Sequence, residues 1–158
     1  MNDTGIRVDD KEVIQALARM SFKSMNKAYR QGMKKALDPI LKQTKANLRT
    51  SGIRNVSKPY ISRKTGKKYK SMISGVKSSV YIGKTEDSFG KVHIMKEFRL
   101  KWFEMGTNIR KTRKGYNRGS ISPKWFFRSA VNQKGEEAAR SLDDNIRDAI
   151  MKAWDNKK

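Results

Sequence analysis

Acidic residues are absent from two long stretches of this chain. Between Pro39 and Thr85 there are 12 Lys or Arg residues and no Asp or Glu, and between Met105 and Gly135 there are 8 and again no acid. Because like charges repel one another, such stretches do not pack against themselves and are typical of a cationic surface with an anionic partner. Nucleic acid is the first candidate for that partner, and an anionic protein or membrane surface is the alternative.

The high positive charge leaves few apolar residues for a core. The 158 residues carry a formal net charge of +22, and Leu, Ile, Val and Phe together number 31. This composition borders on that of disordered chains, but hydrophobic periodicity in several segments predicts one folded domain over residues 1–158. We expect neighbouring subunits to complete its stability. No apolar run approaches the roughly 18 residues that a membrane span needs.

Hydrophobic spacing predicts two helices in the first 50 residues. A short helix is expected over Asp9–Met20, and a longer one over Met25–Arg49, where apolar residues recur at spacings of three and four. Pro39 lies inside the longer helix. Since proline removes one N–H and crowds the preceding turn, a kink or a local break is expected there. Gly52 suits the left-handed turn that ends a helix.

The middle of the chain predicts a small antiparallel sheet. Strand patterns occur in Ser71–Gly83 and Lys91–Phe98, joined across a loop, while Arg99–Met105 fits either a strand or a short helical turn. The strands are clustered rather than alternating with helices, which indicates an α+β fold.

The C-terminal region, about 123–155, predicts helix. Ser122 and Pro123 are typical of a helix start, as an N-cap followed by proline in the first turn. After an interruption near Gly135, the last helix is expected from Glu136 to about Trp154. The predicted fold is therefore an α+β domain in which a kinked N-terminal helix and a C-terminal helix pack on a small antiparallel sheet.

The sequence contains no clear pattern of catalytic or metal-binding residues. His93 is the only histidine and there is no cysteine, so the usual zinc ligand sets are excluded. Gly83-Lys84-Thr85 looks like the end of a phosphate loop, but the first glycine of that motif is missing and no helix is expected to follow. The paired carboxylates are adjacent in sequence, and adjacent side chains point in different directions. We expect no enzymatic activity, no cofactor and no metal.

Two basic loops, 57–70 and 106–122, are the predicted contact sites. Cationic side chains can follow a phosphate backbone without reading its sequence, and neither loop matches a known DNA-binding module. The tyrosines among them could stack on bases or simply anchor the loops. The candidate contacts to nucleic acid or to a neighbouring protein are Lys58, Arg63, Lys64, Lys67, Lys68, Lys70, Arg110, Lys111, Arg113, Lys114 and Arg118.

Two clusters of adjacent aromatic residues, 102–103 and 125–127, suggest a second surface. Core packing is the simplest explanation, but adjacent side chains on a strand do not all face the same side. Exposed Trp and Phe residues are typical of subunit interfaces. The candidate interface residues are Trp102, Phe103, Glu104, Trp125 and Phe126.

Three short motifs resemble one family of phage proteins. Phe103-Glu104-Met105-Gly106-Thr107, followed after a loop by Ser122–Ala130, is similar to segments of the tail-completion and head–tail joining proteins of long-tailed phages. A helix that contains Pro39 and is followed by Thr50-Ser51-Gly52 resembles the start of that family. The resemblance covers roughly residues 25–154.

The resemblance implies a structural protein of the virion. Members of the family are small α+β subunits that form a homo-oligomeric ring, six- or twelve-fold, in the neck of the particle and carry out no catalysis. The ring would join the portal or connector to the tail tube after assembly in the host cytoplasm, with DNA passing through its lumen and no membrane partner. The basic loops would contact DNA or a neighbouring ring. The alternatives are a free architectural DNA- or RNA-binding protein and a nuclease.

Overall fold

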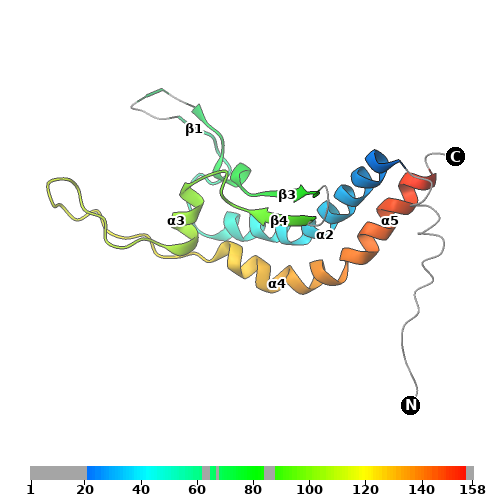
Figure 1. Ribbon diagram of the computed structural model, residues 1–158. Helices are drawn as coiled ribbons and strands as arrows, with labels where there is room; N and C mark the ends of the chain where they lie inside the picture. The colour runs from blue at the N-terminus through cyan, green and yellow to red at the C-terminus, as the bar shows by residue number, and fades with distance from the viewer. Residues whose placement is uncertain (1–20, 62–64, 67, 84–87, 156–158) are drawn as a thin grey trace, which may run out of the picture.

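A computed structural model describes residues 21–61, 65–66, 68–83 and 88–155 of the chain, and the helix expected over Asp9–Met20 lies outside them. The described residues form an α+β fold, as the sequence predicted (Figure 1). In chain order the elements are α2 (Phe22–Thr50), β1 (Tyr60–Ile61), β2 (Lys68–Tyr69), the 3-10 helix η1 (Met72–Gly75), β3 (Lys77–Tyr81), β4 (Phe89–His93), α3 (Arg99–Met105), α4 (Phe126–Arg140) and α5 (Leu142–Asp155).

Helix α2 contacts most of the other elements: α4, α5, η1 and both strands of the β3–β4 hairpin. Its N-terminus is capped by Ser21, whose Oγ accepts a hydrogen bond from the Ser24 N–H at 3.4 Å. The helix continues through Pro39, and its two halves are inclined to one another (Figure 1). Proline therefore bends this helix without breaking it. The buried residues of α2 are Ala28, Gly32, Met33, Ala36, Thr44 and Leu48.

Helices α4 and α5 follow one another along α2 (Figure 1). The interruption expected near Gly135 was wrong, because α4 continues through that residue to Arg140. The break falls at Ser141 instead, where the backbone N–H bonds to the Glu137 carbonyl at 3.1 Å and Oγ bonds to the Ala138 carbonyl at 3.3 Å. Glycine weakens a helix by only about 1 kcal/mol relative to alanine, which packing against α2 readily offsets.

The described strands form two separate antiparallel hairpins. Strands β3 and β4 pair from Lys77 opposite His93 to Tyr81 opposite Phe89. The predicted strands were longer, because η1 occupies the first part of one segment and the chain turns toward α3 in the second. A further hairpin, β1–β2, lies inside the predicted loop 57–70.

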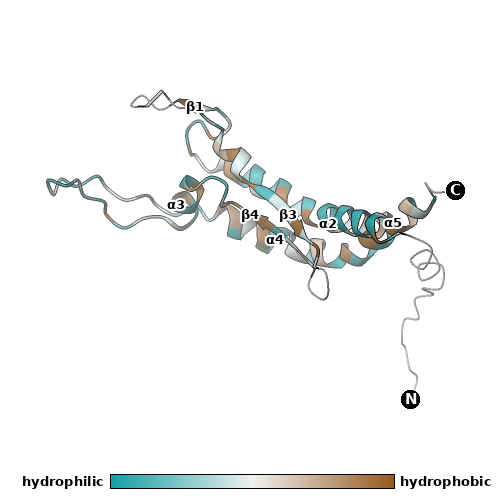
Figure 2. Cartoon of the chain, turned by 45° about the horizontal axis from the view of Figure 1, so that its top comes forward, coloured by the Kyte–Doolittle hydropathy of each residue, from teal (hydrophilic) through white to brown (hydrophobic). Residues whose placement is uncertain are grey.

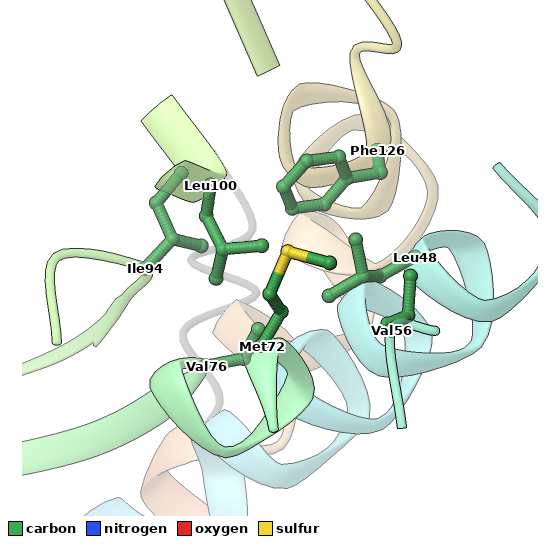
Figure 3. Packing of buried hydrophobic residues seen from close by; sticks show 7 residues of the cluster. All are labelled: Leu48, Val56, Met72, Val76, Ile94, Leu100 and Phe126. Carbon is green, nitrogen blue, oxygen red and sulfur yellow. The ribbon is translucent and has the colours of Figure 1, made fainter. Parts of the chain in front are cut away.

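The main core lies where the C-terminal half of α2 meets η1, α3 and the start of α4. Figure 3 shows the Met72 side chain lying among Leu48, Leu100 and Phe126. A second, smaller cluster around Ala28 and Ile150 holds α5 against the N-terminal half of α2. Because the first cluster includes α3 and the first turn of α4, it fixes the positions of both helices at the end of the molecule from which the basic segments extend.

None of the helices in the described part of the chain combines the length and the apolarity that crossing a membrane requires.

Candidate nucleic-acid and partner interface

The described parts of the first basic segment, residues 58–61, 65–66 and 68–70, include a paired hairpin, and we call these residues arm 1. In its β1–β2 pair, Tyr60 stands opposite Tyr69, with their ring centroids 6.1 Å apart. The Arg99 guanidinium at the start of α3 lies 5.6 Å from the centroid of the Tyr60 ring, so a cation–π contact connects the arm to the helix. Three predicted contact residues of this segment, Arg63, Lys64 and Lys67, lie outside the described residues. The other three, Lys58, Lys68 and Lys70, are exposed.

The second basic segment is an extended ribbon that we call arm 2, residues 107–121. The Thr107 N–H donates to the Ile121 carbonyl at 2.9 Å at its base. Further out, the Arg110 N–H donates to the Gly119 carbonyl at 3.0 Å and the Arg118 N–H to the Arg110 carbonyl at 2.7 Å. The sequence predicted an irregular loop here because the apolar alternation of ordinary strands is missing.

The cationic residues of arm 2 are all exposed: Arg110, Lys111, Arg113, Lys114 and Arg118. Within the described part of the chain, none of the five forms an ion pair with an acid. Figure 2 shows the arm coloured largely hydrophilic and extending away from α3. The side chain of Arg110 lies along the ribbon, with Nε and Nη2 both 3.3 Å from carbonyl oxygens of the opposite side.

Glu104 connects the base of arm 2 to α4. Its Oε2 accepts a hydrogen bond from the Phe127 N–H at 2.8 Å, and its Oε1 accepts one from the Arg128 N–H at 2.9 Å. The carboxyl group from α3 thus caps α4, where the helix dipole favours a negative charge. The helix start expected at Ser122 was wrong, because the segment 121–125 is non-helical and α4 begins at Phe126.

The backbone around Glu104 joins the two halves of the motif that resembles phage neck proteins. The Lys124 N–H donates to the Phe103 carbonyl at 2.8 Å, so the segments on either side of arm 2 lie together. Gly106 has a φ of 75°, and a Cβ there would lie 2.8 Å from the Ile121 carbonyl oxygen. Trp125, with a φ of 47°, takes the N-cap position without capping through its side chain. The motif therefore acts as a structural junction that sets the direction of arm 2.

The structure changes the interpretation of the predicted interface residues. Glu104 is 6% exposed and Phe126 is fully buried in the main core, so neither side chain offers surface to a neighbouring subunit in this conformation of the chain. Phe103 packs against the same core and is half-buried. Only Trp102 and Trp125 among the five expose much of their side chains, and the Arg128 guanidinium lies 4.6 Å from the centroid of the Trp125 ring.

The outer face of α3 carries an apolar stripe, Phe98, Trp102 and Met105, that sequence reasoning largely missed. These residues are 59%, 45% and 60% exposed and recur at spacings of four and three, which places them on one side of the helix. Phe98 and Trp102 form a T-shaped ring pair with centroids 5.2 Å apart. Leu100 faces the opposite way and is fully buried. The helical spacing is visible in the sequence, but the segment Arg99–Met105 fits either a strand or a short helical turn.

A pocket of about 180 Å³ lies between α3 and arm 1, lined by Tyr60, Tyr69, Phe98 and Arg99. The Arg99 guanidinium is paired with Glu97 through two hydrogen bonds, Nε to Oε1 at 2.7 Å and Nη2 to Oε2 at 3.1 Å. The hydrogen bonds from Arg99 hold the pKa of the Glu97 carboxyl below its ordinary value, against the opposing effect of burial. The pocket is therefore largely aromatic, and its one cation is already paired.

Replacing Glu97 by glutamine should lower the free energy of unfolding by about 1 kcal/mol at neutral pH, because Arg99 loses an ionised partner. The stabilisation belongs to the ionised carboxyl, whose folded pKa is depressed. It is therefore present above the ordinary value of 4.5 and lost as the pH falls through the folded pKa. Urea unfolding of both proteins at about pH 7 and pH 3 should show the difference shrink in acid. A difference that is independent of pH would contradict this assignment.

The described residues contain no group of three His, Asp or Glu side chains that could hold a metal ion. His93 ends β4 and is half-buried. Burial, together with Lys91, Lys96 and Lys77 nearby, lowers the pKa of its imidazole below the ordinary value. These observations identify no catalytic arrangement among the described residues, and the lack of enzymatic activity stays a prediction.

No family model, no curated protein and no solved structure matches this chain.

Proposed function

We propose that this chain is a structural subunit in the neck of a tailed phage. It forms a homo-oligomeric ring that joins the portal or connector to the tail tube, and DNA passes through the lumen. The observation that carries the proposal is the pair of basic arms, which leave the same end of the molecule on either side of α3 (Figure 1). The motif resemblance supplies the kind of assembly, and the arms supply the surface that would contact its neighbours.

The exposure of arm 2 supports a function in assembly. An isolated two-stranded ribbon is at best marginally stable in water, since few of its side chains can pack. Arm 2 is such a ribbon: the residues near its tip, Tyr116 included, are exposed. A ring or a neighbouring protein that packs against the arm would supply the missing contacts.

The distribution of charge supports contact with an anionic partner. Arm 2 contains no acid, and its cations are spread along its length. Cations on an extended ribbon suit a sequence-independent contact with a phosphate backbone. The second candidate function, a free architectural DNA- or RNA-binding protein, is favoured by this same observation.

The mass of the purified protein separates the two functions. Light scattering across a range of concentrations should give one closed oligomer for a neck subunit, alone or in isolated necks. The free nucleic-acid binder should instead be a monomer that binds duplex DNA tightly. If about 6–10 phosphates are contacted, its affinity should fall about 10³- to 10⁵-fold between 50 and 200 mM salt. A strict monomer within the particle would rule out the proposed ring.

Reversing two charges at the tip of arm 2, with Arg113→Glu and Lys114→Glu, should weaken binding to a short DNA duplex about tenfold at low salt. It should also reduce the slope of log affinity against log salt concentration by about two, because two phosphate contacts and the counterions they release are lost. Fluorescence anisotropy of a labelled duplex measures both quantities. The matched control is Lys27→Glu with Lys34→Glu, two exposed residues of α2 with the same change in net charge. An equal loss of DNA affinity in both variants would show that overall charge, and not the arm, attracts DNA.

A further inference from the structure

The apolar stripe of α3, formed by Phe98, Trp102 and Met105, lies between the bases of the two arms. Both views of the chain place α3 in the angle between them, with arm 1 and arm 2 extending beyond it in different directions (Figures 1 and 2). Trp102 and Met105 are exposed on this helix, and the described lysine and arginine residues of both arms are exposed as well. We call the stripe and these cations together the α3 face. A partner that covers the α3 face must match both the apolar stripe and the cations of the arms.

The pocket beside the stripe indicates which atoms would enter it. Tyr60, Tyr69 and Phe98 supply three aromatic rings, and the Arg99 guanidinium is already bound by both oxygens of Glu97. A phosphate placed here would meet the Glu97 carboxylate and would gain no unpaired cation. An aliphatic or aromatic side chain would instead bury apolar surface against three rings. Each Å² of apolar surface removed from water stabilises the complex by about 25 cal/mol.

We infer that α3 and the two arms together dock a protein partner whose surface is apolar at its centre and acidic at its rim. This is the usual anatomy of a protein interface, in which a few aromatic anchors are surrounded by polar contacts. The inference rests on the proposed function and gives the chemistry of the neighbour that the subunit joins. The cations that would meet the acidic rim are Lys58, Lys68, Lys70, Arg110, Lys111, Arg113, Lys114 and Arg118.

Three other occupants fit the α3 face less well. Duplex DNA offers phosphates to the arms but no apolar surface to cover Trp102 and Met105. A second copy that presented its own stripe would bring the same exposed cations to this face, which opposes that contact and leaves the other surfaces to form the ring. A flat anionic bilayer attracts the arms, but the arms extend beyond α3 and would hold it away from the membrane plane (Figure 1).

The test uses a synthetic helical peptide with Leu and Phe on one face and Glu on the other. Its counterpart carries serine in place of the apolar residues and has the same charge. Fluorescence anisotropy with the full chain should show the first peptide binding at least tenfold more tightly. Trp102→Ser with Met105→Ser should abolish that preference. Equal binding of the two peptides would overturn the inference.

The control variant is Tyr81→Ser with Phe89→Ser, which removes a different exposed apolar pair. These residues are 55% and 47% exposed, and their rings lie 5.4 Å apart at the end of the β3–β4 hairpin. The control should keep the tenfold preference, and loss of the preference in both variants would overturn the inference. Circular dichroism of each variant should show the helical spectrum of the parent, since all four side chains are exposed.

Further measurements distinguish the rival occupants. Duplex DNA, single-stranded oligo-dT and anionic vesicles should bind the Trp102→Ser, Met105→Ser variant as tightly as the parent. A selective loss of binding to one of these probes would assign the α3 face to nucleic acid or to membrane and overturn the inference. A monomeric parent that keeps the peptide preference would refute the proposed ring while leaving the docking surface intact.

Discussion

Replacing Glu104 by alanine should lower the free energy of unfolding by about 3 kcal/mol. The carboxylate accepts hydrogen bonds from the Phe127 and Arg128 N–H groups and is nearly inaccessible to water. Hydrogen bonds to a charged group contribute about 1.5–3 kcal/mol each, and their loss leaves two N–H groups without a partner. Urea unfolding, followed by circular dichroism, measures the loss directly.

Two further variants separate the cap from a general effect of charge. Glu104→Gln keeps one carbonyl oxygen as an acceptor. It should therefore lower the free energy of unfolding by about half as much as Glu104→Ala does. Glu136→Ala removes a carboxylate that pairs with Arg140 at 2.9 Å on the exposed face of α4. It should lower stability by only about 0.5 kcal/mol. If Glu104→Ala were no more destabilising than Glu136→Ala, the capping role of Glu104 would be refuted.

The Glu104 cap also shows why the start of α4 could not be predicted from local sequence. Ser122 and Pro123 have the side chains of a helix start, and an N-cap is normally found next to the helix it caps. Here the cap comes from α3, on the other side of arm 2, and brings the helix start to Phe126. A contact between residues so distant in sequence depends on the tertiary fold. In contrast, α2 was predicted closely, because its apolar stripe repeats over many turns.

The candidate interface was predictable only in part, for a similar reason. The cations of both arms were identified because charge is a property of single residues and needs no fold. The apolar stripe of α3 was mostly missed, because Phe98 and Met105 join Trp102 on one face only if the segment is a helix. Glu104 and Phe126 were assigned to the surface because the sequence does not show which side of α3 and α4 meets the core.

Two glycines within helices should respond to alanine in opposite directions. A Cβ at Gly32 of α2 would lie 2.6 Å from the Ile146 Cα and 2.7 Å from the Asn145 carbonyl oxygen, both backbone atoms of α5. Gly32→Ala must therefore push α5 away from α2. We expect a loss of about 2 kcal/mol in the free energy of unfolding, since overpacking exceeds the gain in helix propensity.

Gly135 of α4 is the matched control for Gly32. A Cβ there would meet only Val131 Cγ1, at the ordinary contact distance of 3.9 Å. Gly135→Ala should therefore raise the free energy of unfolding by about 0.5–1 kcal/mol, because alanine loses less backbone entropy in a helix. Urea midpoints that move in opposite directions would support both the close approach of α2 to α5 and the continuity of α4 through Gly135. A stabilising Gly32→Ala would show that the two helices are not in close contact, and a destabilising Gly135→Ala would place a break in α4.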